Sequence, residues 1–146
     1  MKHLIIALVI GIGTYGFFQQ NPNSLDVLAK ESRFSQQEQT ISNAYQNKLS
    51  DIQVKGVGRV SRVLPDDNQG SRHQKFILRL PSGQTVLIAH NIDLAPRIPN
   101  LRKGDAVEFY GEYEWSERGG VVHWTHHDPK GRHIGGWLKR DGRVYE

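Results

Sequence analysis

The sequence predicts a mainly β protein, and three patterns carry that prediction. Residues 52–64 form a long β-like run that contains Gly56 and Gly58, as in a strand that bends sharply or bulges. Asp141 and Gly142, between two short apolar runs, are typical of a two-residue hairpin turn. The clearest alternation of apolar and polar residues places one set of side chains on one face of a strand: Val107, Phe109, Gly111, Tyr113 and Trp115.

The N-terminal residues predict a signal peptide or signal anchor over residues 1–18. Lys2 precedes residues 4–18, which carry no charge and are shorter than the roughly 20 residues that span a bilayer as a helix. A positive start before a short apolar run is typical of a secretory signal. Residues 14–16 lack the usual A-x-A pattern, so cleavage after them stays open. We expect an exported protein, periplasmic or membrane-anchored and facing outward, that meets the membrane only through this segment if it is uncleaved.

Residues 19–51 predict a polar helical linker, because Gln, Asn and Ser are frequent and apolar residues are sparse. Ser35 followed by Glu38 matches a capping box, and Ser24 is a candidate cap for a shorter helix. We expect a helix that covers one end of the following domain; a docking helix or a spacer is the alternative. Its single apolar stripe, with one residue in every four, consists of Ile41, Tyr45 and Leu49.

Residues 52–146 predict one β domain, in which turn residues separate the first, second and third strands. Pro96 and Pro99 exclude a long helix after the third strand, so a turn or one helical turn is expected there. A hairpin loop at residues 116–120 joins the fourth strand to the fifth. The expected strands cover residues 52–64, 73–80, 85–90, 107–115 and 121–125, followed by the C-terminal hairpin.

This region resembles known proteins in two ways. Its strand order, its bent first strand and the L-x-x-G-D-x-V-x-F-x-G motif at residues 101–111 resemble an OB-fold barrel. It also resembles a small family of exported bacterial proteins of unknown function, through H-N-I-D-L-A-P-R at 90–97, G-E-Y-E-W at 111–115 and H-W-T-H-H-D-P-x-G-R-H at 123–133. The first resemblance implies a five-stranded OB-like barrel. With the segments described above, the predicted fold is mainly β, with an N-terminal signal or anchor segment, a helical linker and a C-terminal hairpin. The second resemblance implies no particular activity.

Residues 120–137 contain four of the seven histidines and two of the three tryptophans. Residues 121–125 favour a strand and residues 128–131 favour a type I turn, so these side chains are expected at the end of the fifth strand. This density of imidazoles and indoles suggests a site. The residues are His123, Trp124, His126, His127, His133 and Trp137.

Three interpretations of this stretch are open. On an extended strand His123 and His127 share a face but lie about 13 Å apart, which is too far to bind one metal ion. His126 and Asp128 lie on the opposite face, and the turn could bring His133 back towards them. These three residues are the candidate metal ligands, without the fixed spacing of a motif such as H-E-x-x-H. A ligand-binding surface and hydrogen bonding within a polar turn are the alternatives.

A second set of polar residues lies at the end of the third strand, which is a rim position in a small closed barrel. Carboxylates, imidazoles and an arginine on a rim could form a polar ligand pocket. The alternative is that each is a loop residue whose hydrogen bonds are made within its own loop. Together with the histidine stretch, the candidate ligand-binding residues are His90, Asn91, Asp93, Arg97, His123, Trp124, His126, His127, Asp128, Arg132, His133 and Trp137.

One enzyme class is suggested by a further resemblance. The patterns G-x-V-x-x-V-x-x-D at residues 58–66 and I-D-x-A-P at 92–96 resemble thermonuclease-like sequences. That resemblance implies that acidic residues hold calcium and arginines hold phosphate. Arg97 stands where that family has a glutamate, so one acidic residue of its site is missing. A metal-dependent phosphodiester hydrolase is therefore the alternative function; the sequence itself requires no cofactor.

Composition narrows the classes of function. Without cysteine the chain has no disulfide framework and no thiolate catalysis. Its net charge is +4, and basic residues after Ile52 are interleaved in the sequence with Trp124 and Trp137, as in OB domains that hold a phosphate backbone and stack bases. A solvated basic surface is the alternative. We predict an exported binding module of unknown ligand, with a polar histidine-rich site at the end of the fifth strand. Nucleic acid, an anionic polymer of the envelope and a periplasmic peptide are the candidate partners.

Overall fold

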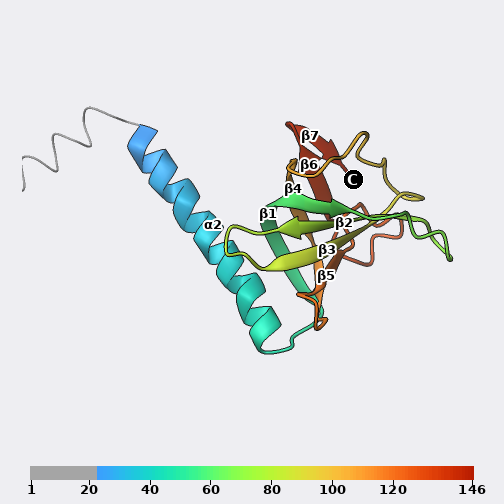
Figure 1. The fold of residues 1–146 in the computed structure, drawn as a ribbon, viewed down its shortest axis with the longest axis horizontal. Coiled ribbons are helices and arrows are strands. Elements are labelled where there is room, and N and C mark those ends of the chain that lie inside the picture. The colour runs from blue at the N-terminus through green and yellow to red at the C-terminus, as the bar shows by residue number, and fades with distance from the viewer. Residues whose placement is uncertain (1–22) are drawn as a thin grey trace, which may run out of the picture. The chain divides into compact units, whose positions relative to one another are not determined.

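The computed structural model describes residues 23–146, and within them the chain forms one helix and seven strands (Figure 1). The predicted signal or anchor segment over residues 1–18 lies outside the described residues. Among the residues described, no helix combines the length and apolar character needed to cross a membrane. The elements are α2 (Asn23–Gln46), β1 (Ile52–Val63), β2 (His73–Arg79), β3 (Thr85–Asn91), β4 (Ala106–Glu114), β5 (Val121–His123), β6 (Trp137–Arg140) and β7 (Arg143–Tyr145).

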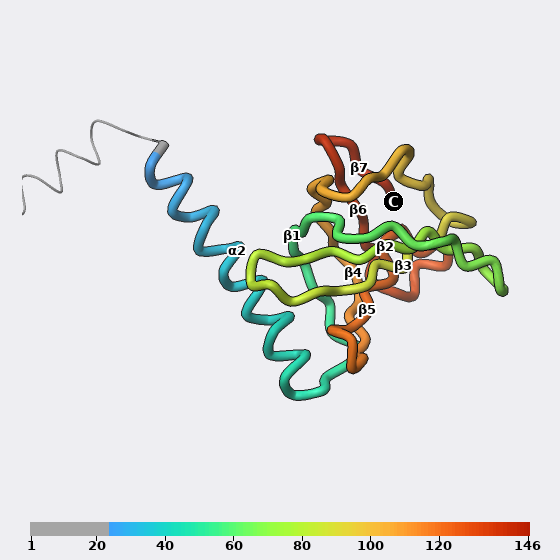
Figure 2. Tube along the Cα trace, viewed as in Figure 1, coloured from blue at the N-terminus to red at the C-terminus, as the bar shows by residue number. Residues whose placement is uncertain are grey.

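The first five strands close into a barrel. β1 pairs with β2 along one edge and with β4 along the other. β2 pairs with β3, β3 runs parallel to β5, and β5 pairs with β4, so the order is β1-β2-β3-β5-β4 and back to β1. The strands can be followed around this closed path in Figure 2. The predicted five-stranded OB-like barrel is therefore confirmed.

β1 serves two neighbours because it bends. Its first part pairs with β4 and its last part with β2, and the register with β2 shifts after Val60. At the bend, the two glycines allow the backbone of β1 to lie close to neighbouring residues of β4 and β2. A Cβ on Gly56 would lie 2.6 Å from Phe109 Cζ, and one on Gly58 would lie 2.9 Å from the Arg79 carbonyl oxygen. Both glycines predicted to bend the strand are thus required by packing.

β6 and β7 form the predicted C-terminal hairpin. β6 pairs with β4, and β7 folds back on β6. Asp141 and Gly142 have φ values of 50° and 78°, which is the backbone of the two-residue turn that the dipeptide favours. Leu138 and Tyr145 are buried, so the hairpin contributes side chains to the core.

Alternate residues of the strands point inward and build one apolar core. The alternating face of β4 behaves as predicted up to Tyr113, which is fully buried. Trp115 lies beyond the end of β4 and is only partly buried, packed against the core, with its indole N–H donating to the Tyr45 carbonyl oxygen at 3.1 Å. The core consists of Ile41, Ala44, Val54, Val60, Phe76, Leu78, Leu80, Val86, Ile88, Ile98, Val107, Phe109, Tyr113, Val122, Leu138 and Tyr145.

The C-terminal part of α2 belongs to the compact unit of the barrel, which covers residues 36–146. Ile41 and Ala44 are fully buried and pack in the barrel core. Leu49, the third residue of the predicted stripe, lies beyond the helix and is exposed. Part of the segment predicted as a linker therefore packs with the barrel.

The predicted capping box is wrong, because α2 is continuous through it. Ser35 lies inside the helix and its hydroxyl donates to the Glu31 carbonyl oxygen one turn earlier. Glu38 makes a tertiary contact, since its carboxylate accepts the Ser82 N–H at 2.9 Å. Gln and Glu are good helix formers, so no boundary is needed at this point of the chain.

Candidate functional site

β5 ends at His123, two residues earlier than the sequence predicts. Trp124 has a positive φ of 52°, which breaks the extended conformation. The assumption that one strand runs on to residue 127 and alternates between two faces is therefore wrong. Thr125 instead points into the barrel, where it is fully buried and shares a hydrogen bond with His90.

Asp128 organises the loop that follows. Its carboxylate accepts hydrogen bonds from the backbone N–H groups of Lys130, Arg132 and His133 at 3.0, 2.8 and 2.9 Å. The Gly131 N–H bonds to the Asp128 carbonyl oxygen, which closes the predicted turn. The Lys130 and Arg132 N–H groups lower the pKa of Asp128 to about 2, although burial raises it. Both oxygens of this predicted metal ligand are thus occupied by the backbone.

Trp124 contacts two of the predicted histidines. The His133 ring stacks on the indole, with centroids 3.9 Å apart and planes 9° apart. His126 lies 5.3 Å from the indole at 32°, is buried, and has Nδ1 2.7 Å from the His127 carbonyl oxygen. The His127 side chain is exposed.

His133 connects this loop to β4. Its Nδ1 lies 2.8 Å from the Ile134 carbonyl oxygen, and its Nε2 lies 2.5 Å from Glu112 Oε2. A carbonyl and a carboxylate both accept, so this arrangement suits a ring that donates from both nitrogens, which is the imidazolium form. Burial opposes this charge, but the hydrogen bonds to Ile134 and Glu112 raise the pKa of His133 above its ordinary value. The arrangement therefore favours the charged form of the His133 ring beside Trp124.

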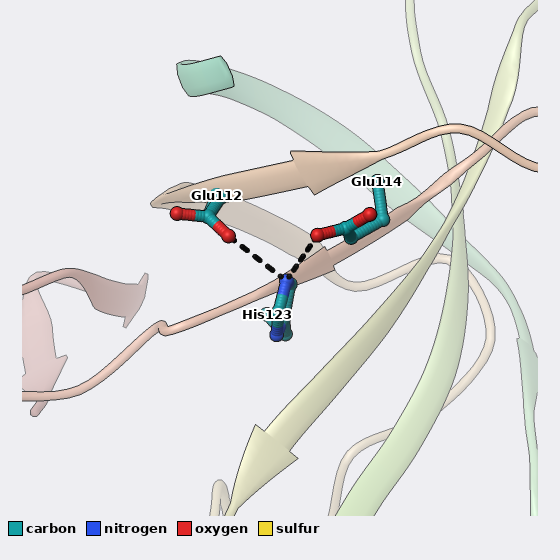
Figure 3. Close-up of side chains that lie close together, drawn as sticks. All are labelled: Glu112, Glu114 and His123. Atoms are coloured by element: carbon teal, nitrogen blue, oxygen red, sulfur yellow. Dashed lines mark ion pairs between the residues drawn. The ribbon is translucent and has the colours of Figure 1, made fainter. Parts of the chain in front are cut away.

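Glu112 also belongs to a group that sequence reasoning missed. Glu112 and Glu114 point from β4 towards His123, which β5 places opposite Glu112 (Figure 3). His123 Nε2 lies 3.5 Å from Oε1 of each glutamate, and the three ligand atoms all lie within 4.8 Å of one another. This group could hold a metal ion. The signal in the sequence is G-E-Y-E-W, which puts two glutamates on the polar face of an alternating strand.

The predicted metal set does not converge in this way. Within residues 23–146, the group with metal-ligating geometry is Glu112, Glu114 and His123. It includes none of the three predicted ligands, which were His126, Asp128 and His133. The chain leaves the strand at Trp124, and the Asp128 carboxylate turns to backbone N–H groups.

His90, predicted for a rim pocket, lies inside the barrel. Its side chain is fully buried, its Nε2–H donates to the Pro96 carbonyl oxygen at 3.0 Å, and its Nδ1 accepts from the Thr125 hydroxyl at 2.8 Å. Burial lowers the pKa of His90 to about 4, against the effect of the Pro96 hydrogen bond. The neutral ring ties β3 to the residues that follow it and to the segment after β5.

The other rim residues make local contacts. Asn91 accepts the Asp93 N–H, and the Asp93 carboxylate accepts both the backbone N–H and the guanidinium of Arg72. Those Arg72 hydrogen bonds lower the pKa of Asp93. Arg97 forms an ion pair with Asp66, one of the acidic residues of the thermonuclease-like pattern. In the described part of the chain, neither Asp66 nor Asp93 joins a group with metal-ligating geometry.

The loop after β5 lines a pocket of about 740 Å³, called the Trp124 pocket below. Four predicted ligand-binding residues lie in it, while Trp137 does not. Trp137 is on β6, where the Lys55 ammonium lies 5.2 Å from its ring centre. The Trp124 pocket is lined by Leu94, Trp124, Asp128, Pro129, Lys130, Arg132 and His133.

Comparisons with known proteins place the chain in a family without assigning an activity. Residues 25–146 match the model of a family described as "Protein of unknown function (DUF3465)". No curated protein matches the chain. The predicted membership of an uncharacterised family is confirmed at this level. The H-W-T-H-H-D-P-x-G-R-H signature and export stay predictions.

Proposed function

Because the chain belongs to the DUF3465 family, whose function is unknown, we propose a function from its own geometry. The protein is an exported OB-like binding module, and its Trp124 pocket takes an anionic polymer that carries flat rings, as single-stranded nucleic acid does. The observation that carries this proposal is the juxtaposition in one pocket of cationic side chains with an indole and other apolar walls.

The positive charge of the pocket is available to a ligand. Lys130 and Arg132 are exposed, and among the ion pairs of residues 23–146 none involves either of them. Arg72, Arg97 and Arg140, by contrast, are each paired with an aspartate. Exposed cations that are not held in an ion pair supply the salt-dependent part of polyanion binding.

The apolar walls of the pocket are held in place. Trp124 is fixed by the parallel stack with His133, and the loop that carries both is tied by the Asp128 hydrogen bonds. Leu94 is 47% exposed and faces the same pocket. A preformed wall binds a ring with little loss of side-chain entropy.

Affinity for a fluorescently labelled single-stranded oligonucleotide tests this function. Replacing Lys130 and Arg132 together by alanine is expected to weaken binding at least tenfold and to reduce the slope of log K against log salt by about 0.7 per lost phosphate contact. The matched control removes two exposed basic residues outside the pocket, Lys103 and Arg118. If both double variants lose affinity equally, overall charge drives binding and the pocket assignment is wrong.

An anionic polysaccharide without aromatic rings serves as the second probe. The proposal expects it to bind more weakly than the oligonucleotide and to be insensitive to Trp124→Leu. Stronger binding of the polysaccharide would identify an envelope polymer as the ligand class and would overturn ring recognition.

Export rests on the uncharged run at residues 4–18 behind Lys2. A fusion of residues 1–25 to a reporter that is active only outside the cytoplasm is expected to be active. The same fusion with Leu8→Arg and Ile10→Arg is the control, because two charges abolish an apolar signal core. Equal activity of the two fusions, or none in either, would reject export by this segment.

A further inference from the structure

We propose that Glu112, Glu114 and His123 form a binding site for one divalent zinc ion, with His133 as the residue that positions Glu112. The three ligands come from paired strands, since β4 supplies the glutamates and β5 the histidine. Their placement therefore depends on the sheet and not on a mobile loop. Figure 3 shows the two carboxylates and the imidazole turned towards a common centre.

The distances fit a metal better than they fit hydrogen bonds. His123 Nε2 lies 3.5 Å from Glu112 Oε1 and also 3.5 Å from Glu114 Oε1. An N–H···O hydrogen bond is about 2.7 to 3.2 Å long. Ligand atoms at about 2.0 to 2.2 Å from a tetrahedral zinc ion are about 3.3 to 3.6 Å apart. The distance from His123 Nε2 to each glutamate oxygen falls in this range.

The nitrogen between the carboxylates has no other role in the described structure. His123 Nε2 is buried, and within residues 23–146 it finds no hydrogen-bond partner. A buried polar atom without a hydrogen-bond partner destabilises the fold unless a bound ion or a water molecule satisfies it. A metal ion bound to Nε2 would satisfy this atom and would also draw together two like-charged carboxylates.

The donor set selects the kind of metal. One imidazole and two carboxylates form a borderline set that suits zinc, and the absence of cysteine excludes the thiolate sites of soft metals. Calcium prefers six to eight oxygen ligands, so a nitrogen ligand disfavours it. Among divalent ions of this type zinc binds more tightly than manganese.

His133 orients the Glu112 carboxylate for metal binding. Its Nε2 lies 2.5 Å from Glu112 Oε2, which leaves Oε1 facing His123. A hydrogen bond to the distal oxygen of a ligating carboxylate is the usual outer support of a metal site, and its loss weakens binding about 10- to 100-fold. Trp124 holds the His133 ring from its face, so the loop after β5 supports the site.

The site is open to solvent on one side. Glu114 and His123 also line a pocket of about 330 Å³, together with Lys75 and His73. Three protein ligands leave the fourth position of a tetrahedral zinc ion for water or for a small anion.

Titration of untagged, EDTA-treated protein with zinc by calorimetry tests the proposal. The parent is expected to bind one zinc ion per chain, more tightly than manganese and without measurable calcium binding. Glu114→Gln and His123→Ala are expected to weaken zinc binding at least tenfold. Glu108→Gln, on the same face of β4, and His127→Ala, an exposed histidine, are the matched controls and are expected to bind as the parent does.

Three results would contradict the proposed zinc site. No stoichiometric zinc binding, calcium binding in preference to zinc, or loss of binding in His127→Ala but not in His123→Ala would each overturn the site. Circular dichroism checks that each variant is folded, and a zinc-dependent rise in melting temperature in the parent, absent from Glu114→Gln, gives a second readout.

The role of His133 has its own test. His133→Ala is expected to weaken zinc binding about 10- to 100-fold at unchanged stoichiometry, and His133→Gln, which keeps a donor for Glu112, is expected to restore most of the loss. Equal losses in the two variants would reject the positioning role. Oligonucleotide binding by the parent is repeated in the presence of EDTA, which removes zinc. Binding that persists there does not depend on the zinc site, so failure of the zinc site and failure of the proposed function are distinguishable.

Discussion

Acid is expected to destabilise this barrel through one buried histidine. His90 is fully buried and neutral between Thr125 and Pro96, and burial lowers its pKa to about 4. In the unfolded chain the same ring has the ordinary histidine pKa of 6.5. The unfolded chain therefore takes up a proton that the folded chain refuses. The free energy of unfolding must then fall as the pH falls from 6.5 towards 4, and above pH 6.5 this effect is absent.

The magnitude follows from the two pKa values. Each pK unit of difference corresponds to about 1.4 kcal/mol. Between pH 7.5 and pH 5.0, uptake by His90 alone lowers the free energy of unfolding by about 2 kcal/mol. His133 acts in the opposite direction, since its pKa is raised and its contribution is present in acid and lost as the pH rises. A variant that changes only His90 is needed to separate the two.

Denaturant unfolding of the parent and of His90→Gln at pH 7.5 and pH 5.0 measures this effect. Glutamine donates to the Pro96 carbonyl and accepts from the Thr125 hydroxyl, but it does not titrate. The loss of stability between the two pH values is expected to be about 2 kcal/mol larger in the parent, whatever the stability of the variant at pH 7.5. An equal loss in both proteins would show that His90 does not carry the acid sensitivity.

Four further variants test packing and the Asp128 hydrogen bonds by denaturant unfolding at pH 7. Ile41→Ala is expected to lower the free energy of unfolding by about 2 to 5 kcal/mol because it leaves a cavity in the core. Leu28→Ala, at an exposed position of the same helix, is the control and is expected to change it by less than about 0.5 kcal/mol. Equal small effects would refute packing of the C-terminal part of α2 in the barrel core. Replacing a fully buried aromatic residue by alanine lowers the free energy of unfolding by about 3 to 5 kcal/mol. Trp115→Ala is expected to lower it by less, because Trp115 is only partly buried, and a loss in that range or above would contradict this position. Asp128→Ala is expected to lower the denaturant midpoint, since three N–H groups lose their acceptor; an unchanged midpoint would mean that these bonds do not hold the loop.

The strands were predictable because their signals are local. Apolar side chains of β4 alternate with a period of two, so the inward face could be assigned before any partner strand was known. Asp141 and Gly142 specify their turn through backbone conformations that few other residue pairs adopt. The end of β5 was not predictable in the same way, since the sequence after Val121 stays β-like while Trp124 turns the chain at a positive φ.

The residues of the candidate site could not be identified from the sequence, because contacts between distant segments distinguish them. His90, Asp128 and His126 looked equivalent in the sequence to His123 and His133, because all are polar residues at strand ends or turns. The structure separates them by their partners. His90 faces the core and Asp128 bonds to its own loop, while the imidazoles of His123 and His133 both reach Glu112.

The mainly β class, the bent first strand, the closing hairpin and the stretch rich in histidine and tryptophan could all be predicted, since each depends on residues close together in the chain. Which of those side chains meet depends on how distant segments pack. Glu112 lies opposite His123 because β4 and β5 pair in one register, and a shift of one residue would send the glutamates inward. His133 reaches Glu112 because the loop held by Asp128 returns to β4. Register and loop return are set by contacts between distant residues, and no local pattern in the chain encodes them.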